Sequence, residues 1–214
     1  MSSTLGSRLA FEQAVKSINS AGKSTERAVL SQSYLRLETA LVQGQTQYKF
    51  DLLVNENSNG SANFPTVNKL NLQDCFYISQ LAFFLYAPAS VSDTKATLLT
   101  YPNTTVFGAG ASEYYTIYNG YMSLTVNQRV VIPYWNLNRH MVINQTQQTA
   151  TLRDQVNLGQ DGFYPVEPNI TISGDRKNDL TVTLPAGLGA TITANSRLVC
   201  VMNGILAQNV TSVN

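Results

Sequence analysis

Few residues in this chain are of the types that perform catalysis. Among 214 residues there is one histidine, His140, and there are two cysteines, Cys75 and Cys200. Nucleophilic catalysis needs a base, an orienting carboxylate and a Ser or Cys nucleophile that converge in space. No Gly-x-Ser-x-Gly motif, which exposes the nucleophile of many hydrolases, accompanies the histidine. The sequence therefore predicts a structural or surface role for His140 and no catalytic residues.

Two short segments resemble ligand-binding motifs only in part. Residues 174–179 contain two aspartates and one asparagine. Their side-chain oxygens are the type of ligand that hard cations prefer. Two basic residues in the same segment oppose cation binding, so we interpret it as a solvated turn before a strand. Residues 108–112 have the glycines of a phosphate loop but lack the Lys-Ser/Thr that completes one. We therefore predict no metal site and no cofactor.

Both cysteines lie in apolar runs, residues 75–78 and 198–202. Free cysteines in such surroundings behave as small hydrophobic side chains, and two buried free thiols are the favoured interpretation. A disulfide that joins two strands is the alternative. In either case the pattern is not that of an extracellular disulfide scaffold, which contains many more cysteines.

Charge and composition favour a protein that forms surfaces. Charged residues make up 13% of the chain and the net charge is +1, whereas a nucleic-acid-binding domain is usually strongly basic. Asn, Gln, Ser, Thr and Tyr are abundant instead. This balance favours a structural or binding protein over an enzyme, and it argues against an overall electrostatic attraction to nucleic acid.

The chain contains no apolar run long enough for a membrane span. The longest, residues 81–87, is far shorter than the ~20 residues that cross a bilayer. Residues 1–7 lack a positive segment followed by an apolar one, which a secretory signal peptide requires. The sequence therefore predicts no membrane span and no export by an N-terminal signal.

Residues 1–31 predict a helical N-terminal arm. Phe11, Val15 and Ile18 lie at helical spacing, and a second short helical stretch is expected at residues 24–30. A helix of this length is marginal alone in water, so the apolar stripe needs a partner surface, on its own subunit or on a neighbour. The basic residues lie mostly off the stripe, free to meet acidic protein or phosphate. The candidate assembly-arm residues are Arg8, Phe11, Val15, Lys16, Ile18, Lys23 and Arg27.

The pattern changes to alternating short strands after the arm, which predicts one antiparallel β-sandwich, of jelly-roll type, over residues 32–214. Residues 75–88 are apolar on both faces, so this strand should lie in mid-sheet with both sides covered. The Gly-containing link at residues 43–46 and Asn119-Gly120 each predict a hairpin between neighbouring strands. The other expected strands are residues 34–42, 47–54, 96–101, 114–118, 122–126, 130–133, 170–172, 180–185 and 198–202.

An aromatic group lies in the middle of the chain, and three interpretations of it stay open. Aromatic side chains with Asn and Gln form strand cores and cross-strand pairs, protein interfaces and sugar-binding faces. The candidate interface aromatics are Tyr114, Tyr115, Tyr118, Tyr121, Tyr134 and Trp135.

A helical arm followed by an Asn/Gln/Thr/Tyr-rich β-sandwich with polar loops, such as residues 55–65, resembles jelly-roll capsid and accessory virion proteins of bacterial viruses. The resemblance extends over the whole chain. It implies a non-enzymatic virion subunit that self-assembles through its sandwich and arm and is found in the virion after synthesis in the host cytoplasm. Its implied partners are itself and other virion proteins, with weak genome contact through the arm. The alternative is a carbohydrate-binding or adhesin-type β-sandwich module, whose partner is a glycan.

Overall fold

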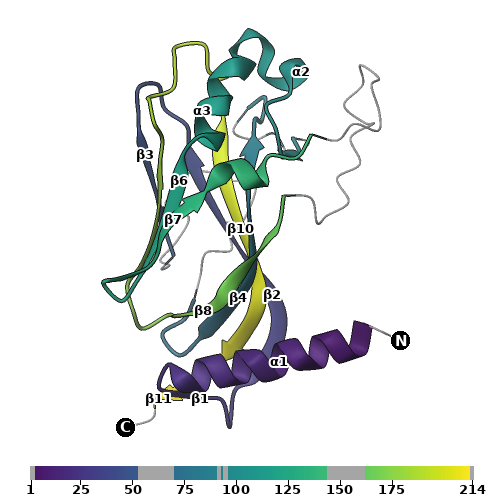
Figure 1. Cartoon of the computed structure of the whole chain (residues 1–214), viewed down its shortest axis with the longest axis vertical. Coiled ribbons are helices and arrows are strands. Elements are labelled where there is room, and N and C mark those ends of the chain that lie inside the picture. Colours follow the sequence, from purple (N-terminus) through teal and green to yellow (C-terminus); the bar gives the residue numbers. More distant parts are fainter. Residues whose placement is uncertain (1–2, 53–69, 91–92, 94–95, 144–161, 213–214) are drawn as a thin grey trace.

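Short alternating segments build two antiparallel sheets that pack face to face, with one long helix against the outside of one sheet (Figure 1). The computed structural model describes residues 3–52, 70–90, 93, 96–143 and 162–212. The polar stretch 55–65 lies outside the described residues. The expectation of a mainly β, sandwich-like fold is confirmed.

The five-stranded sheet is centred on one long apolar strand, β4 (Cys75–Tyr86). On one side β4 pairs with β10 (Arg197–Gln208), which pairs in turn with β2 (Val29–Ala40). On its other side β4 pairs with β8 (Tyr164–Ser173) and with the short β5 (Leu98–Leu99). The four-stranded sheet has the order β3 (Gln47–Asp51), β9 (Asn178–Thr183), β6 (Tyr121–Val126) and β7 (Arg129–Asn136).

The strands pair as a nested set around the β6–β7 hairpin. Asn127 and Gln128 form its two-residue turn with φ of 51° and 64°, and such turns require positive φ at both positions. Outward from this turn, β4 pairs with β8, β3 with β9, and β2 with β10, all antiparallel. Segments progressively farther apart in sequence therefore lie side by side.

The main core fills the space between the two sheets. Phe76, Ile78, Leu81, Phe83 and Leu85 of β4 are all buried there, which confirms the prediction for this strand. The pairing of β4 with β8 has a register irregularity between Ile78 and residue 80. Phe76 and Ile78 lie before this irregularity, and Leu81, Phe83 and Leu85 lie after it. Because a bulge inserts one extra residue, the alternation resumes on the same face.

The opposite face of β4 is also covered. Ala82, Phe84 and Tyr86 form a second apolar cluster with Val199 and Val201 of β10. The expectation that this run has both faces covered is confirmed. Burial on both faces explains why the sequence of β4 is apolar without alternation.

The N-terminal helix α1 (Ser3–Ser20) packs on the outer face of its own five-stranded sheet. Ala14 contacts Tyr77 and Ile205 in one buried cluster, and Ile18 lies in another that includes Cys75. In Figure 1, α1 crosses the lower end of β2, β4 and β10, and its N-terminal end extends beyond them. The partner surface that the apolar stripe requires is therefore supplied, at least in part, by the same subunit.

The second helix expected in residues 24–30 is not formed, and that prediction is wrong. Gly22 ends α1 with φ of 80°, and the chain continues into β1 (Lys23–Ser24), which pairs with β11 (Thr211–Ser212). β2 then begins at Val29. Pairing with the C-terminal strands satisfies these backbone groups, so strand formation prevails over local helical spacing. Only the first part of the expected arm is helical.

Two predicted hairpins are also wrong. β2 and β3 belong to different sheets, and Gly44 turns the chain between them while its N–H donates to the Leu188 carbonyl. Asn119-Gly120 follows α3 (Tyr115–Tyr118) instead of a strand. Residues 114–118, which were expected to form a strand, belong to a helical stretch that also includes α2 (Thr104–Phe107) and the 3-10 helix η1 (Gly108–Tyr114).

The helical stretch carries a pattern that explains the error. Phe107, Ala111, Tyr114 and Tyr118 are buried, and they follow one another at intervals of three or four residues. This is the spacing of one helix face. Local aromatic content favoured a strand, but the period favours the observed helical turns.

Candidate functional site: a groove between two sheet edges

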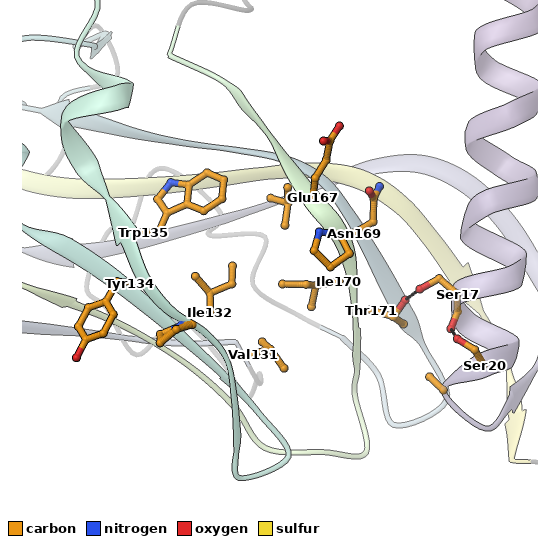
Figure 2. Close-up of a pocket in the computed structure, with 14 residues that line it drawn as sticks. Ser17, Ser20, Val131, Ile132, Tyr134, Trp135, Glu167, Asn169, Ile170 and Thr171 are labelled. Atoms are coloured by element: carbon orange, nitrogen blue, oxygen red, sulfur yellow. Dashed lines mark hydrogen bonds between the residues drawn. The ribbon is translucent and has the colours of Figure 1, made fainter.

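A groove lies between β7 and β8 on the described surface. β7 is the outermost strand of the four-stranded sheet, and no described strand pairs with the free side of β8. The C-terminal end of α1 closes one end of the groove through Ser17 and Ser20, as Figure 2 shows. The groove has a volume of ≈ 520 Å³, within the usual range for ligand sites.

A hydrogen bond fixes the end of α1 against this groove. The hydroxyls of Ser17 and Thr171 are 2.7 Å apart (Figure 2), and Ile18, on the next position, is fully buried. α1 and β8 therefore hold a fixed relative position. The groove is bounded by three elements that are distant in sequence.

The walls of the groove are largely apolar. Val131 and Ile132 contribute from β7, and Val166 and Ile170 from β8. Glu167 is the single charged side chain among the 14 described residues that line the groove. The remaining lining residues are Ser17, Ser20, Ala21, Pro133, Tyr134, Trp135, Pro168, Asn169 and Thr171.

Prolines interrupt both strand edges that border the groove. Pro133 lies in β7, and Pro165 and Pro168 lie in β8. Proline has no N–H to donate, and on edge strands it opposes the addition of another strand. β7 also has two register irregularities in its pairing with β6. The groove therefore suits inserted side chains better than an added strand.

His140 lies buried behind the groove, at the end of the 3-10 helix η2 (Leu137–His140). The Trp135 indole Nε1–H donates to His140 Nε2 at 2.8 Å, and His140 Nδ1 lies 2.6 Å from the Gly162 carbonyl oxygen. Since Nε2 accepts, the ring is neutral and Nδ1–H donates. The ring also contacts Phe83 and Tyr164 edge-on. These contacts join the end of β7 to the residues that precede β8.

Burial governs the protonation of His140. Desolvation lowers its pKa from 6.5 to about 4, and the nearby Arg139 charge adds to this effect, while the hydrogen bond with Gly162 opposes it. The ring is therefore uncharged near neutral pH. A fully enclosed, uncharged ring with both nitrogens engaged is a structural element that supports Trp135 from behind the groove.

The aromatic group divides into buried and exposed members. Tyr114, Tyr118 and Trp135 are buried, and the Tyr114 hydroxyl is 2.7 Å from Ser196 Oγ. Tyr115, Tyr121 and Tyr134 are exposed. The core interpretation therefore describes the first three. The interface and sugar-binding interpretations stay predictions for the other three.

The most exposed of these side chains borders the groove. Tyr134 is 76% exposed, and its ring packs edge-on against Tyr121 of the neighbouring strand β6, with centroids 5.1 Å apart. Arg139 lies over the Trp135 ring, 4.3 Å from the centroid. Aromatic side chains and the Arg139 guanidinium thus lie close together near the C-terminal end of β7.

The candidate arm residues have different environments. Ile18 is buried, and Phe11 and Val15 are half-buried. Among the cations, three are exposed as expected: Arg8, Lys16 and Arg27. Arg8 pairs with Glu12 through Nε at 3.2 Å, one turn along the exposed face of α1.

Lys23 is not a free cation, and that prediction is wrong. It is buried, and its Nζ lies 2.5 Å from Asp175 Oδ2 and 3.1 Å from Ser212 Oγ. Desolvation raises the pKa of Asp175, but hydrogen bonds from Lys23 and Ser173 and the Lys23 charge outweigh it and hold the pKa below its ordinary value. Lys23 joins the N-terminal segment to the turn after β8. The expected solvated turn at residues 174–179 thus supplies its partner.

Replacing Lys23 with alanine should lower the free energy of unfolding by about 1–3 kcal/mol, because a partly buried carboxylate loses its partner. Urea denaturation at neutral pH measures this difference. Lys16→Ala is the matched control: it removes the same charge from an exposed position and should change stability by less than about 0.5 kcal/mol. Equal effects of the two substitutions would contradict the structural role of Lys23.

Both cysteines are free and buried, as the favoured interpretation expected. Burial raises the pKa of both thiols, so the reactive thiolate is disfavoured. Across the described ranges, no three His, Cys, Asp or Glu residues cluster in a way that would hold a metal ion. None of the described helices combines the length and apolarity that a membrane crossing needs.

No protein-family model and no curated protein matches the chain.

The sequence did not single out the groove, although it contains a signal for it. Pro133, Pro165 and Pro168 lie within or beside segments that otherwise predict strands. Proline in such a segment marks an edge strand. Two proline-bearing edges that flank one core are the pattern that could have indicated this surface.

Proposed function

We propose that the chain is a virion structural protein, a capsid or capsid-associated subunit with a jelly-roll β-sandwich. The nested strand pairing carries this proposal. A jelly roll results when one long antiparallel hairpin rolls into two four-stranded sheets. The orders β2-β10-β4-β8 and β3-β9-β6-β7 are those that such rolling generates. The four pairs that surround the β6–β7 turn support the assignment.

The fold alone does not determine function, since jelly rolls include capsid and lectin domains. The character of the described surface favours the subunit of an assembly. The groove has apolar walls and little charge, and Val130 and Tyr134 of β7 are strongly exposed. Exposed apolar and aromatic side chains beside a groove are typical of protein contact surfaces.

The proposal includes partners and location. The subunit contacts copies of itself and other virion proteins, and it is incorporated into the virion after synthesis in the host cytoplasm. Arg8, Lys16 and Arg27 are the exposed cations of the N-terminal segment. Weak contact with the genome through these side chains would diminish as salt concentration rises.

Assembly of the purified full chain tests the proposal. We expect sedimentation velocity over a series of protein concentrations to show a concentration-dependent transition from subunits to discrete larger species, and electron microscopy to show rings or shells. A protein that remains monomeric at every concentration and salt condition would contradict the assignment.

A carbohydrate-binding module is the second candidate, favoured by the exposed Tyr121–Tyr134 pair. Aromatic faces with a polar edge stack on sugars. Under this alternative a glycan array should give a specific signal that Tyr134→Ala removes. Tyr115→Ala, which changes an exposed tyrosine outside this pair, is the matched control.

A further inference from the structure

The two ends of α1 differ in the support they receive. Its C-terminal half is anchored to the sheet by Ala14 and Ile18, whereas its N-terminal end extends beyond the sheet (Figure 1). In the N-terminal half of α1, Leu9 is 55% exposed. The Arg8 side chain is 83% exposed, and it pairs with the exposed Glu12, 3.2 Å away on the same helix. An exposed apolar side chain thus lies next to an exposed cation on this helix.

The groove at the other end of α1 has the complementary properties. Its walls are apolar around Val131 and Ile170, and its single charge among the described lining residues is the carboxylate of Glu167. The last turn of α1, which closes the groove, contains no basic side chain, and the first turn contains no acidic one. Each end of the helix dipole therefore lacks a compensating charge within its own helix.

The N-terminal end of α1 cannot occupy the groove of its own chain. Ser17 and Ser20 line the groove. Leu9 and Ser17 are eight positions apart on one continuous helix, a distance of about 12 Å. In Figure 1 the N-terminus lies at the opposite end of α1 from the last turn, which closes the groove. Any α1 that enters the groove must come from a second copy.

We propose that the N-terminal half of α1 docks in the β7–β8 groove of a neighbouring copy through Arg8 and Leu9. Leu9 inserts between the apolar walls, and Arg8, whose exposed pair with Glu12 contributes little stability, approaches Glu167 at the rim. The contact is head-to-tail, because it joins different surfaces of the two copies, and repetition of such a contact generates a closed ring or an open filament. This inference rests on the proposed self-assembling function and names the surfaces that perform it.

Other occupants fit these observations less well. The prolines on both edges oppose an added β-strand. The Glu167 carboxylate opposes a small anion. A helix end that combines an apolar side chain with positive charge matches both the walls and the rim, and this chain presents one.

Disulfide trapping between two variants tests the contact directly. One population carries Leu9→Cys and the other Asn169→Cys, a position that lines the groove. We expect a disulfide-linked dimer when the two are mixed under mild oxidation and little when either is alone. Leu9→Cys mixed with Val42→Cys is the control. Val42 is exposed, follows the C-terminal end of β2 and does not line the groove. Cross-linking no greater than in this control would overturn the proposal.

Charge exchange tests the rim. Arg8→Glu and Glu167→Arg should each weaken association on the order of 10-fold, and the combination should restore most of the loss at low salt. Lys16→Glu makes the same charge change on the same helix at a position outside the groove's lining and should leave association unchanged. No rescue in the double variant, or equal weakening by Lys16→Glu, would overturn the pairing.

The two proposals fail in different ways. A wild-type chain that stays monomeric refutes the self-assembling function and this contact together. A wild-type chain that assembles while the Leu9–Asn169 pair does not cross-link refutes the contact and leaves the function standing. Binding of a glycan that blocks the disulfide would instead assign the groove to the carbohydrate alternative and overturn this inference.

Discussion

Replacing Phe83 with alanine should lower the free energy of unfolding by about 3–5 kcal/mol. Phe83 is 1% exposed and lies on the central strand β4. Its ring meets Phe50 of the facing sheet at 6.3 Å and His140 at 5.4 Å. Truncation would leave a cavity where the two sheets and the wall behind the groove meet. Urea denaturation with a wild-type m-value would measure the loss.

The control for this substitution is Val130→Ala, on the exposed side of β7. Val130 is 55% exposed, so its truncation removes little buried area and should change stability by less than about 0.5 kcal/mol. A Phe83→Ala protein as stable as Val130→Ala would contradict the assignment of Phe83 to the core.

The titration of His140 alone should lower the free energy of unfolding by about 3 kcal/mol as pH is lowered from about 6.5 to about 4. The pKa of the folded state is about 4, whereas an unfolded histidine titrates near 6.5. Between these values the unfolded chain binds the extra proton and the folded chain does not. The stabilisation is therefore complete above the unfolded pKa and is lost as pH falls towards the folded one.

Urea denaturation at pH values from 4 to 8 tests this dependence. Carboxylates also titrate in the lower part of that range, so the comparison is with His140→Gln, which keeps a donor and an acceptor but has no such titration. The wild type should lose more stability than the variant between pH 6.5 and pH 5. Parallel curves for the two proteins would show that His140 is already solvated or charged in the folded state.

The sequence predicts those features that depend on local burial. β4 is apolar on both faces because both faces are covered, and burial acts on each residue of the strand independently. The helical stripe of α1 is equally local, and Ile18 is buried as its spacing indicates. Free buried cysteines follow from the same apolar surroundings.

Features that depend on distant partners were not predictable in the same way. Lys23 resembles any surface lysine in sequence, and it is buried because Asp175 and Ser212 meet it from far along the chain. The groove likewise requires β7, β8 and α1 to converge. Propensity describes neighbours in sequence, whereas these environments are created by neighbours in space.

The nested pairing has a consequence for synthesis on the ribosome. The β6–β7 hairpin can close as soon as residues 121–136 have emerged, because its partners are adjacent. β2 must wait until residues 197–208 follow, since β10 lies between β2 and β4. Contacts between such distant segments form slowly, and unpaired strands invite aggregation in the interval. The edges that β2 and β4 present to β10 therefore stay unpaired until residues 197–208 have been synthesised, although β4 can pair with β8 on its other edge before then.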